Sequence, residues 1–502
     1  MNAFGHEVEK LTDLAYNYRI NTLYDSAISI NDSILKNNPP AKYRVSAFLE
    51  NALCNIEIRM LSKAFEYIKK AENIISRKDL SAENPKYYYV LARYLNLTGG
   101  NKAKFYFQKS LRFLAVNDPF YIETSVIYSD YLIETNDLKN AEKILRKAFK
   151  FQKLYHLHNT YLLSRILLQY GYFLYKKNEL EKSISCYDKI LKPLLITNYD
   201  KRWAKFLYAE SIRLKAWPLR ALGDYQEALN NNKVFLNQIT QLFDNQYFRV
   251  GEVYQSISII YDLLGNIELA TEYVNQSIQF AIENKNASRL LSNYYSKALL
   301  LYKEKKYIKC IITARKIESL YKNTYRQKYY SSLLLYFIAQ SQFNLGKTDS
   351  ALKTIEKCIF LRKEVRPENL YYSLPAYDVK IKYLLSIKDI EEAQSIFTKI
   401  KSIVDLDDAI NYPKLLQFFI DYSEYLLYNG YHNECKENLY SINVWFKVFS
   451  KRYPDILKNS TFRKYFKEFY LVRSNLFNEK YKSDRTYENV KLAFNDLKIY
   501  YE

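Results

Sequence analysis

The segments GDYQEAL (residues 223–229) and GNIELATEYVNQSI (residues 265–278) decide the fold of this chain. Each begins with a glycine, has an aromatic or aliphatic residue two positions later, and has an alanine three positions beyond that. Glycine commonly follows the last residue of a helix, and a small residue such as alanine lets two helices approach closely. The pattern therefore predicts a turn followed by a tightly packed helix, and its recurrence predicts a repeat architecture.

The same pattern occurs eleven times along the chain. A small residue follows each turn, at Ala27, Ala64, Ala103, Ala141, Ser183, Ala228, Ala270, Cys310, Ala351, Ala393 and Cys435. A second residue, usually small, precedes each of these by twelve positions, at Ala15, Ala52, Leu91, Ser129, Gly171, Ala216, Ser258, Ala298, Ala339, Ile381 and Ser423. Because helices cross closely only where side chains are small, we expect the two residues of each copy to face each other across a helix pair.

These copies resemble the tetratricopeptide repeat family, whose unit is a pair of antiparallel helices that cross at small residues. Successive copies lie 37 (Ala27 to Ala64) to 45 (Ser183 to Ala228) residues apart, which is longer than the family's usual repeat of about 34 residues. The resemblance implies an all-α fold, a right-handed superhelical solenoid of about eleven helix-turn-helix repeats over residues 1–449. Because a solenoid needs a solvated end, we expect residues 450–502 to form a basic helical C-terminal cap.

The composition agrees with a repeat array and excludes several other classes of protein. The 502 residues exceed the roughly 250–300 residues at which single cores stop growing. Nine glycines and ten prolines are too few for a many-stranded β protein, whereas 48% apolar residues suffice for a buried core. The net charge of 75 − 54 = +21 leaves two interpretations open, an anionic partner such as nucleic acid and a codon bias toward lysine.

The sequence lacks the motifs of common enzymes and metal sites. It contains no phosphate-binding loop, no dinucleotide-binding glycine motif, no nucleophile elbow and no zinc-protease motif. Its four histidines lack the spacing to cysteines or carboxylates that a zinc site needs. Cys310, Cys358 and Cys435 occupy small-residue positions of the repeat, which indicates buried thiols in a reducing compartment. Since no apolar run reaches the roughly 20 residues that span a membrane, we expect a cytoplasmic, non-enzymatic protein without metal, cofactor or membrane insertion.

A candidate ligand site lies in the fifth and sixth copies. In the family, set positions of the first helix of each unit face the concave groove, and the resemblance places six basic and aromatic residues there: Arg165, Tyr172, Lys176, Arg213, Trp217 and Arg220. Arginine binds carboxylates and phosphates through two parallel hydrogen bonds, and aromatic rings accept apolar side chains. We expect Arg213 and Arg220, seven residues apart with Trp217 between them, to contact one ligand. An ordinary solvated surface explains the same residues equally well.

The function indicated by these features is that of a protein- or peptide-binding scaffold or adaptor. Its partner would carry an acidic or C-terminal segment that the groove residues hold. One alternative is a receptor that senses a signal peptide and acts through a partner protein, since long repeats of this kind are similar to those of bacterial peptide-sensing regulators. Another is a nucleic-acid-binding solenoid, which the net charge favours and the acidic Glu123, Asp130 and Glu252 near the predicted groove disfavour.

Overall fold

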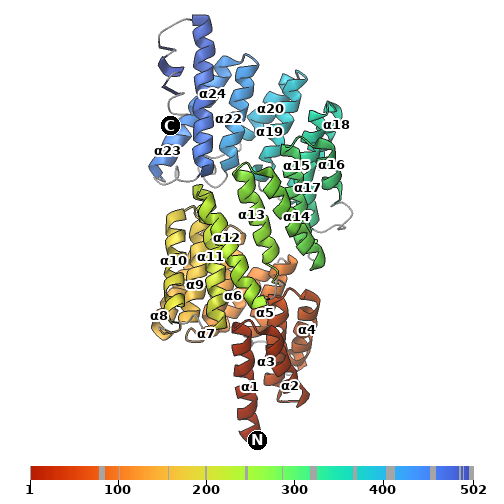
Figure 1. Ribbon diagram of the computed structural model, residues 1–502, viewed down its shortest axis with the longest axis vertical. Coiled ribbons are helices and arrows are strands. Elements are labelled where there is room, and N and C mark those ends of the chain that lie inside the picture. The colour runs from red at the N-terminus through yellow and green to blue at the C-terminus, as the bar shows by residue number, and fades with distance from the viewer. Residues whose placement is uncertain are drawn as a thin grey trace. The chain divides into compact units, whose positions relative to one another are not determined.

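The computed structural model of the chain is helical throughout its described residues, where no β-strand is found (Figure 1). It describes residues 2–77, 85–100, 102–156, 158–197, 201–243, 247–284, 287–316, 325–365, 370–402, 413–452, 460–484, 488–489, 491–493 and 495–496. The all-α prediction is confirmed. Among the described helices none is long and apolar enough to cross a lipid bilayer.

The chain divides into two compact units, the first of which comprises Met1–Arg220 and Gln226–Val253. Its helices are α1 (Asn2–Ile20), α2 (Tyr24–Lys36), α3 (Ala41–Glu57), α4 (Leu61–Arg77), α5 (Pro85–Thr98), α6 (Ala103–Phe113), α7 (Pro119–Glu134), α8 (Leu138–Tyr155), α9 (Thr160–Lys176), α10 (Leu180–Thr197), α11 (Arg202–Leu222) and α12 (Tyr225–Phe243). From α1 to α10, each odd-numbered helix packs on the even-numbered helix that follows it. These pairs are the first five predicted copies.

The second unit comprises Ala221–Tyr225 and Tyr254–Glu502. Its helices are α13 (Val250–Leu263), which begins in the first unit, α14 (Ile267–Glu283), α15 (Ala287–Lys303), α16 (Tyr307–Arg315), α17 (Tyr325–Asn344), α18 (Thr348–Val365), α19 (Leu370–Ser386), α20 (Ile390–Lys401), α22 (Pro413–Tyr428), α23 (His432–Arg452) and α24 (Ser460–Asp484). The last of these packs on α22 and α23, and its Phe469 is fully buried. The boundary at residues 449 and 450 stays a prediction.

The small residues lie where the repeat pattern predicts. All eleven residues that follow a turn, from Ala27 to Cys435, are 0% exposed. In the fifth copy the Ser183 hydroxyl donates to the carbonyl of Gly171 at 2.7 Å, and in the seventh the Ser258 hydroxyl donates to the carbonyl of Ala270 at 2.7 Å. The register of the helix pairs is therefore confirmed at these positions.

The third copy departs from the predicted register by one residue. Leu91 is only half-buried, whereas the adjacent Ala92 is 0% exposed. The prediction of Leu91 as the crossing residue was therefore wrong. The smaller Ala92 lets the two helices approach more closely than leucine would.

Every described turn between the two helices of a pair contains one residue in the left-handed conformation. These residues are Thr22, Arg59, Gly99, Asn136, Asn178, Gly223, Gly265, Lys305, Gly346, Lys388 and Gly430. At ten of these turns the next residue donates its N–H to a carbonyl five residues earlier, as Asn266 does to Tyr261 at 2.9 Å. This hydrogen bond is the Schellman arrangement, which satisfies carbonyls at the C-terminus of a helix. Six of the turns adopt it without glycine.

Candidate functional site

A cavity of about 480 Å³ lies within the first unit. Its walls come from α1, α3, α5, α7, α9 and α11, with the segment Tyr247–Arg249 and the start of α13. All of these helices are the first members of their pairs. The cavity is thus built from the same helix of successive repeats, and the second helices of the pairs contribute little to its lining.

The wall helices α7, α9 and α11 each contribute a stripe of residues that recur every three or four positions. From α9 the cavity is lined by Tyr161, Arg165, Leu168, Gln169 and Tyr172. Residues with this spacing share one face of a helix, because an α-helix has 3.6 residues per turn. One continuous face of α9 therefore points into the cavity.

Contacts between the first two repeats and the sixth close one side of the cavity. The Arg202 Nε donates to the Thr22 hydroxyl at 3.2 Å, and the Trp203 N–H donates to the side-chain oxygen of Asn21 at 3.3 Å. The Arg59 guanidinium lies 4.7 Å from the centre of the Phe248 ring. Segments about 180 residues apart in the chain thus meet beside the same cavity.

The cavity wall is rich in charges of both signs, and its formal charge is balanced. Six arginines line it: Arg19, Arg59, Arg93, Arg165, Arg213 and Arg249. Six carboxylates line it as well: Glu57, Glu123, Asp130, Glu134, Glu210 and Glu252. A wall of this kind differs from a uniformly positive groove, which a long polyanion would need.

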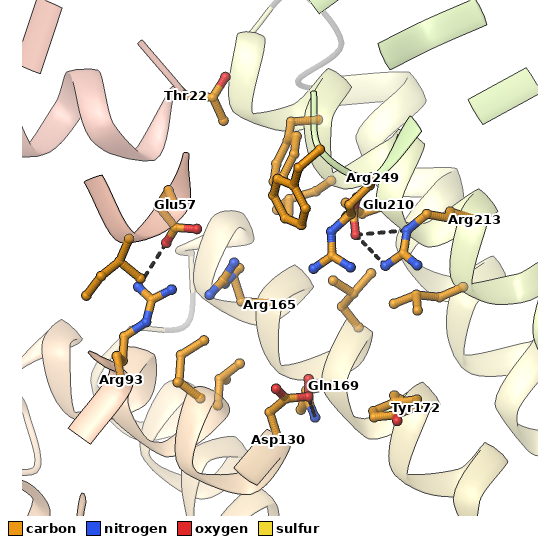
Figure 2. Close-up of a pocket in the computed structure, with 18 of the residues that line it drawn as sticks. Thr22, Glu57, Arg93, Asp130, Arg165, Gln169, Tyr172, Glu210, Arg213 and Arg249 are labelled. Carbon is orange, nitrogen blue, oxygen red and sulfur yellow. Dashed lines mark hydrogen bonds and ion pairs between the residues drawn. The ribbon is translucent and has the colours of Figure 1, made fainter. Parts of the chain in front are cut away.

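Four of the six arginines are engaged in ion pairs. Arg93 pairs with Glu57 at 2.9 Å, and Arg213 pairs with Glu210 at 2.8 Å (Figure 2). Arg249 lies 3.4 Å from Glu210 and 3.3 Å from Glu252. These pairs hold the guanidinium groups in fixed positions in the wall.

Arg19, the fourth paired arginine, connects three repeats. It is 4% exposed and pairs with Glu50 on α3 and, at 3.0 Å, with Glu123 on α7. Burial raises the pKa of Glu50, but Arg19 and Lys86 outweigh burial and hold this pKa at about 2. Glu50 therefore stays ionised at neutral pH, and the network joins the first, second and fourth repeats.

Arg165 differs from these four, since no carboxylate in the described part of the chain pairs with it. Its Nε atom is buried and has no hydrogen-bond partner. Burial lowers the pKa of this guanidinium, but Tyr161, Glu123 and Glu57 raise it, and the result lies above the usual value. In Figure 2 a dashed line joins Arg93 to Glu57, whereas no dashed line reaches Arg165.

An aromatic cluster lies farther along α9 and α11. The Tyr172 and Trp217 rings are 5.5 Å apart in an edge-to-face contact, and Tyr175 lies 5.9 Å from Trp217. The Tyr172 hydroxyl donates to Glu134. Arg213 also approaches Trp217, with 5.3 Å between the guanidinium and the ring centre. This cluster gives the cavity an apolar surface beside its charges.

The six residues predicted from sequence have different positions. Arg165, Tyr172, Arg213 and Trp217 line the cavity. Lys176 lies beside it, 5.2 Å from the Tyr172 ring and 3.6 Å from Glu134. Arg220 is half-buried and is not among the lining residues, and Arg213 is held by Glu210. Whether these residues bind a ligand stays a prediction.

The sequence reasoning did not name Arg19, Arg93 and Arg249 as candidates for the site. Arg19 stands four residues after Ala15, as Arg220 stands four after Ala216, so the positional rule applied to the first copy would have found it. Arg249 lies just before α13, in a segment for which the repeat pattern makes no prediction.

Metal-binding side chains and cysteines are arranged as follows in the described residues. No group of three histidine, cysteine, aspartate or glutamate residues is arranged there to hold a metal ion. All five cysteines are buried and free. Burial raises the pKa of Cys186 to about 11 and that of Cys435 to about 12, so these thiols are protonated at neutral pH.

Comparisons with known proteins agree with the repeat architecture. The tetratricopeptide repeat family matches residues 333–364, which lie in α17, α18 and the turn between them. No curated protein matches the sequence significantly.

Several solved structures are similar in fold. Apo NprR, a quorum sensor from B. thuringiensis, has a TM-score of 0.47 and 14% identity over 75% of this chain and 98% of its own. A Rap protein complexed with competence and sporulation factor has a TM-score of 0.48 and 12% identity over 72% of this chain and 98% of its own. A monomeric mutant of IFIT1 with m7Gppp-AAAA has a TM-score of 0.44 and 14% identity over 79% of this chain and 90% of its own. At such identities these likenesses concern the fold alone.

Proposed function

Because this chain is a tetratricopeptide-type helical repeat protein, we propose that it is a non-enzymatic scaffold that binds a peptide or a peptide segment of a partner protein in the cavity of its first unit. The observation that carries this proposal is the cavity itself, which combines paired arginines, an aromatic cluster on the inner helices of six repeats, and Arg165, with which no carboxylate of the described residues pairs. Its volume of about 480 Å³ lies within the range of sites that enclose small molecules and short peptide segments.

The nature of the wall supports a peptide more than a nucleic acid. A peptide offers carboxylates and backbone amides to the charged groups and apolar side chains to the rings of Tyr172 and Trp217. A nucleic acid would need positive charge over successive repeats, but here the six lining arginines face six lining carboxylates. The net charge of +21 then gives only weak, salt-sensitive attraction to nucleic acids.

The closure of the cavity supports a second candidate, in which binding regulates a partner protein. The turn at Asn21 and Thr22 contacts Arg202 and Trp203 beside the cavity. A ligand that enters between these segments would change their contacts and shift the first repeats relative to the sixth. A signal-sensing receptor would use such a shift.

The test begins with the partner that co-purifies with the full chain from its native cells, identified by mass spectrometry. Calorimetry then compares binding of its recognised segment to the wild type, Trp217→Ala and Phe105→Ala. Phe105 is the matched control, because it is an aromatic residue on α6 that is 56% exposed and does not line the cavity.

We expect Trp217→Ala to weaken binding by roughly 2 kcal/mol, as buried aromatic residues in interfaces commonly do, while Phe105→Ala leaves it unchanged. Equal affinities for all three folded proteins would place the partner outside the cavity. A tight complex with a nucleic acid that tolerates physiological salt would favour the nucleic-acid alternative instead.

A further inference from the structure

The arginines of the cavity differ in what neutralises them. Arg19, Arg93, Arg213 and Arg249 each have a carboxylate within 3.5 Å in the described residues. Arg59 is exposed and lies against the Phe248 ring. Arg165 remains as a lining guanidinium with a buried Nε, no hydrogen bond to that atom and no ion pair within the described residues.

A buried guanidinium group is costly when its donors are unmatched. Its planar fork offers two parallel N–H groups, and a carboxylate supplies two oxygens in the matching geometry. Arg19 shows this chemistry within the protein, since it donates to the two oxygens of Glu123 from Nη1, at 3.0 Å, and Nη2, at 3.4 Å. Arg165 has no such carboxylate partner among the described residues, and a ligand that carries a carboxylate would supply one.

The face of α9 also gives the direction in which such a ligand extends. Gln169 lies one turn after Arg165 and donates to Asp130 at 3.2 Å, and Tyr172 of the aromatic cluster follows almost one turn later. Seven residues of helix span about 10 Å, which is the length of about three extended peptide residues. A carboxylate at Arg165 is thus about three residues away from a side chain that packs on Tyr172 and Trp217.

We propose that Arg165 is the anchor for a free carboxylate of the ligand, and that the residues before this carboxylate run along α9 to the aromatic cluster. This inference rests on the proposed peptide-binding function and names its specificity. A C-terminal carboxylate and an acidic side chain share the required chemistry, so the experiment separates these two sources.

The experiment titrates three short peptides into the full chain by calorimetry. Acetyl-Phe-Ala-Ala carries a free C-terminal carboxylate, its C-terminal amide carries none, and acetyl-Phe-Ala-Glu amide carries a carboxylate only on its side chain. The proteins are the wild type, Arg165→Gln, Arg165→Lys and Arg146→Gln. Arg146 is the matched control, because it is a 70% exposed arginine on α8 that pairs with Glu142 outside the cavity.

We expect the wild type to bind at least one carboxylate peptide about tenfold or more tightly than the neutral amide, a difference of about 1.4 kcal/mol. The acid peptide whose affinity exceeds that of the neutral amide by the larger factor identifies the source of the carboxylate. Arg165→Gln is expected to abolish the preference, Arg165→Lys to retain part of it because the charge remains without the fork, and Arg146→Gln to keep all of it. Melting temperatures identify any variant that fails to fold, and Arg165→Lys then serves as the test.

Three results would overturn the inference. They are equal binding of the acids and the amide by the wild type, no binding of either acid, and an unchanged preference in folded Arg165→Gln. If the native partner still depends on Trp217 in any of these cases, the proposed function stands and only the role of Arg165 is rejected. If neither the partner nor the peptides depend on cavity residues, both proposals fail together.

Discussion

Single residues in left-handed conformations set the turns of this repeat array, and six of the eleven are not glycine. Lys305, between α15 and α16, has φ 59°, and Gly265, between α13 and α14, has φ 78°. A side chain in this conformation costs roughly 1 kcal/mol because its Cβ approaches a backbone oxygen. The turns without glycine therefore carry strain that the hydrogen bonds of the Schellman arrangement offset.

Lys305→Gly is expected to stabilise the second unit by about 0.5–1 kcal/mol, because glycine adopts this conformation without strain. Gly265→Ala is expected to destabilise it by about 1 kcal/mol, although no atom lies within 4 Å of the added Cβ. Urea denaturation measures both changes. Lys306→Gly is the control, since Lys306 has φ −82° and gains nothing from glycine. A loss of stability in Lys305→Gly would contradict the role assigned to the turn.

A pair of buried carboxyl groups in the second unit gives a prediction about pH. Asp378 on α19 lies close enough to Asp421 on α22 for each carboxyl group to affect the pKa of the other, and Gln417 donates to Asp421 at 2.5 Å. Burial raises the pKa of Asp421 to about 6, with contributions from Glu468 and Glu424. Because the folded state favours the protonated acid, stability is fully present below pH 4 and decreases as the pH rises through about 6.

Asp421→Asn removes this ionisation while it keeps the shape of the side chain. We expect the variant to exceed the wild type in stability by on the order of 1–2 kcal/mol at pH 8 and to match it near pH 4. Thermal melts of the two proteins from pH 4 to pH 8 measure the difference. Parallel stability curves over this range would show that Asp421 ionises without cost in the folded protein.

At the scale of the elements, the crossing residues of each helix pair fix the distance between its helices. Ala228 on α12 and Ala270 on α14 are both 0% exposed. In the fifth pair, a Cβ built on Gly171 would lie 2.7 Å from the Tyr187 ring, so that crossing has no space for a side chain. The pairs are therefore sensitive to added volume at these positions.

Ala228→Leu and Ala270→Leu are each expected to cost roughly 1–3 kcal/mol through overpacking. Chemical denaturation measures the loss. Asn230→Leu is the control. Asn230 is exposed on the same helix as Ala228, so this substitution adds a leucine side chain outside the helix crossing. If the two core variants lost no more stability than the control, the helix pairs would be packed in another register.

The helices could be predicted from the sequence because their signals are local. Small residues spaced by twelve positions mark both helices of a pair, and the structure buries them at every post-turn position. The third copy was misplaced by one residue because Leu91 and Ala92 both fit the apolar pattern, and only packing distinguishes them. The turns at Arg59, Lys305 and Lys388 gave no signal, since their conformation comes from helix-end hydrogen bonds and not from residue type.

At the scale of the molecule, the sequence did not predict the cavity in full. The positional rule of the repeat identified Arg165, Tyr172 and Trp217, since each lies on an inner helix. It gave no information on the distant partners of the arginines, because Glu57, which pairs with Arg93, lies 36 residues away in the chain. The contact of Thr22 with Arg202 depends on the curvature of six repeats. This curvature is the sum of small angles between successive helices, and no local sequence pattern encodes it.

Hydrogen exchange of the full chain, free and bound to its native partner, tests the central claim that the cavity of the first unit is the binding site. We expect the partner to slow exchange in α7, α9 and α11, whose faces line the cavity, and in the turn at Thr22 that closes it. The paired helices α8 and α10 serve as internal controls and should change little. Protection confined to α8 and α10, or to helices α14 to α24 of the second unit, would contradict the claim.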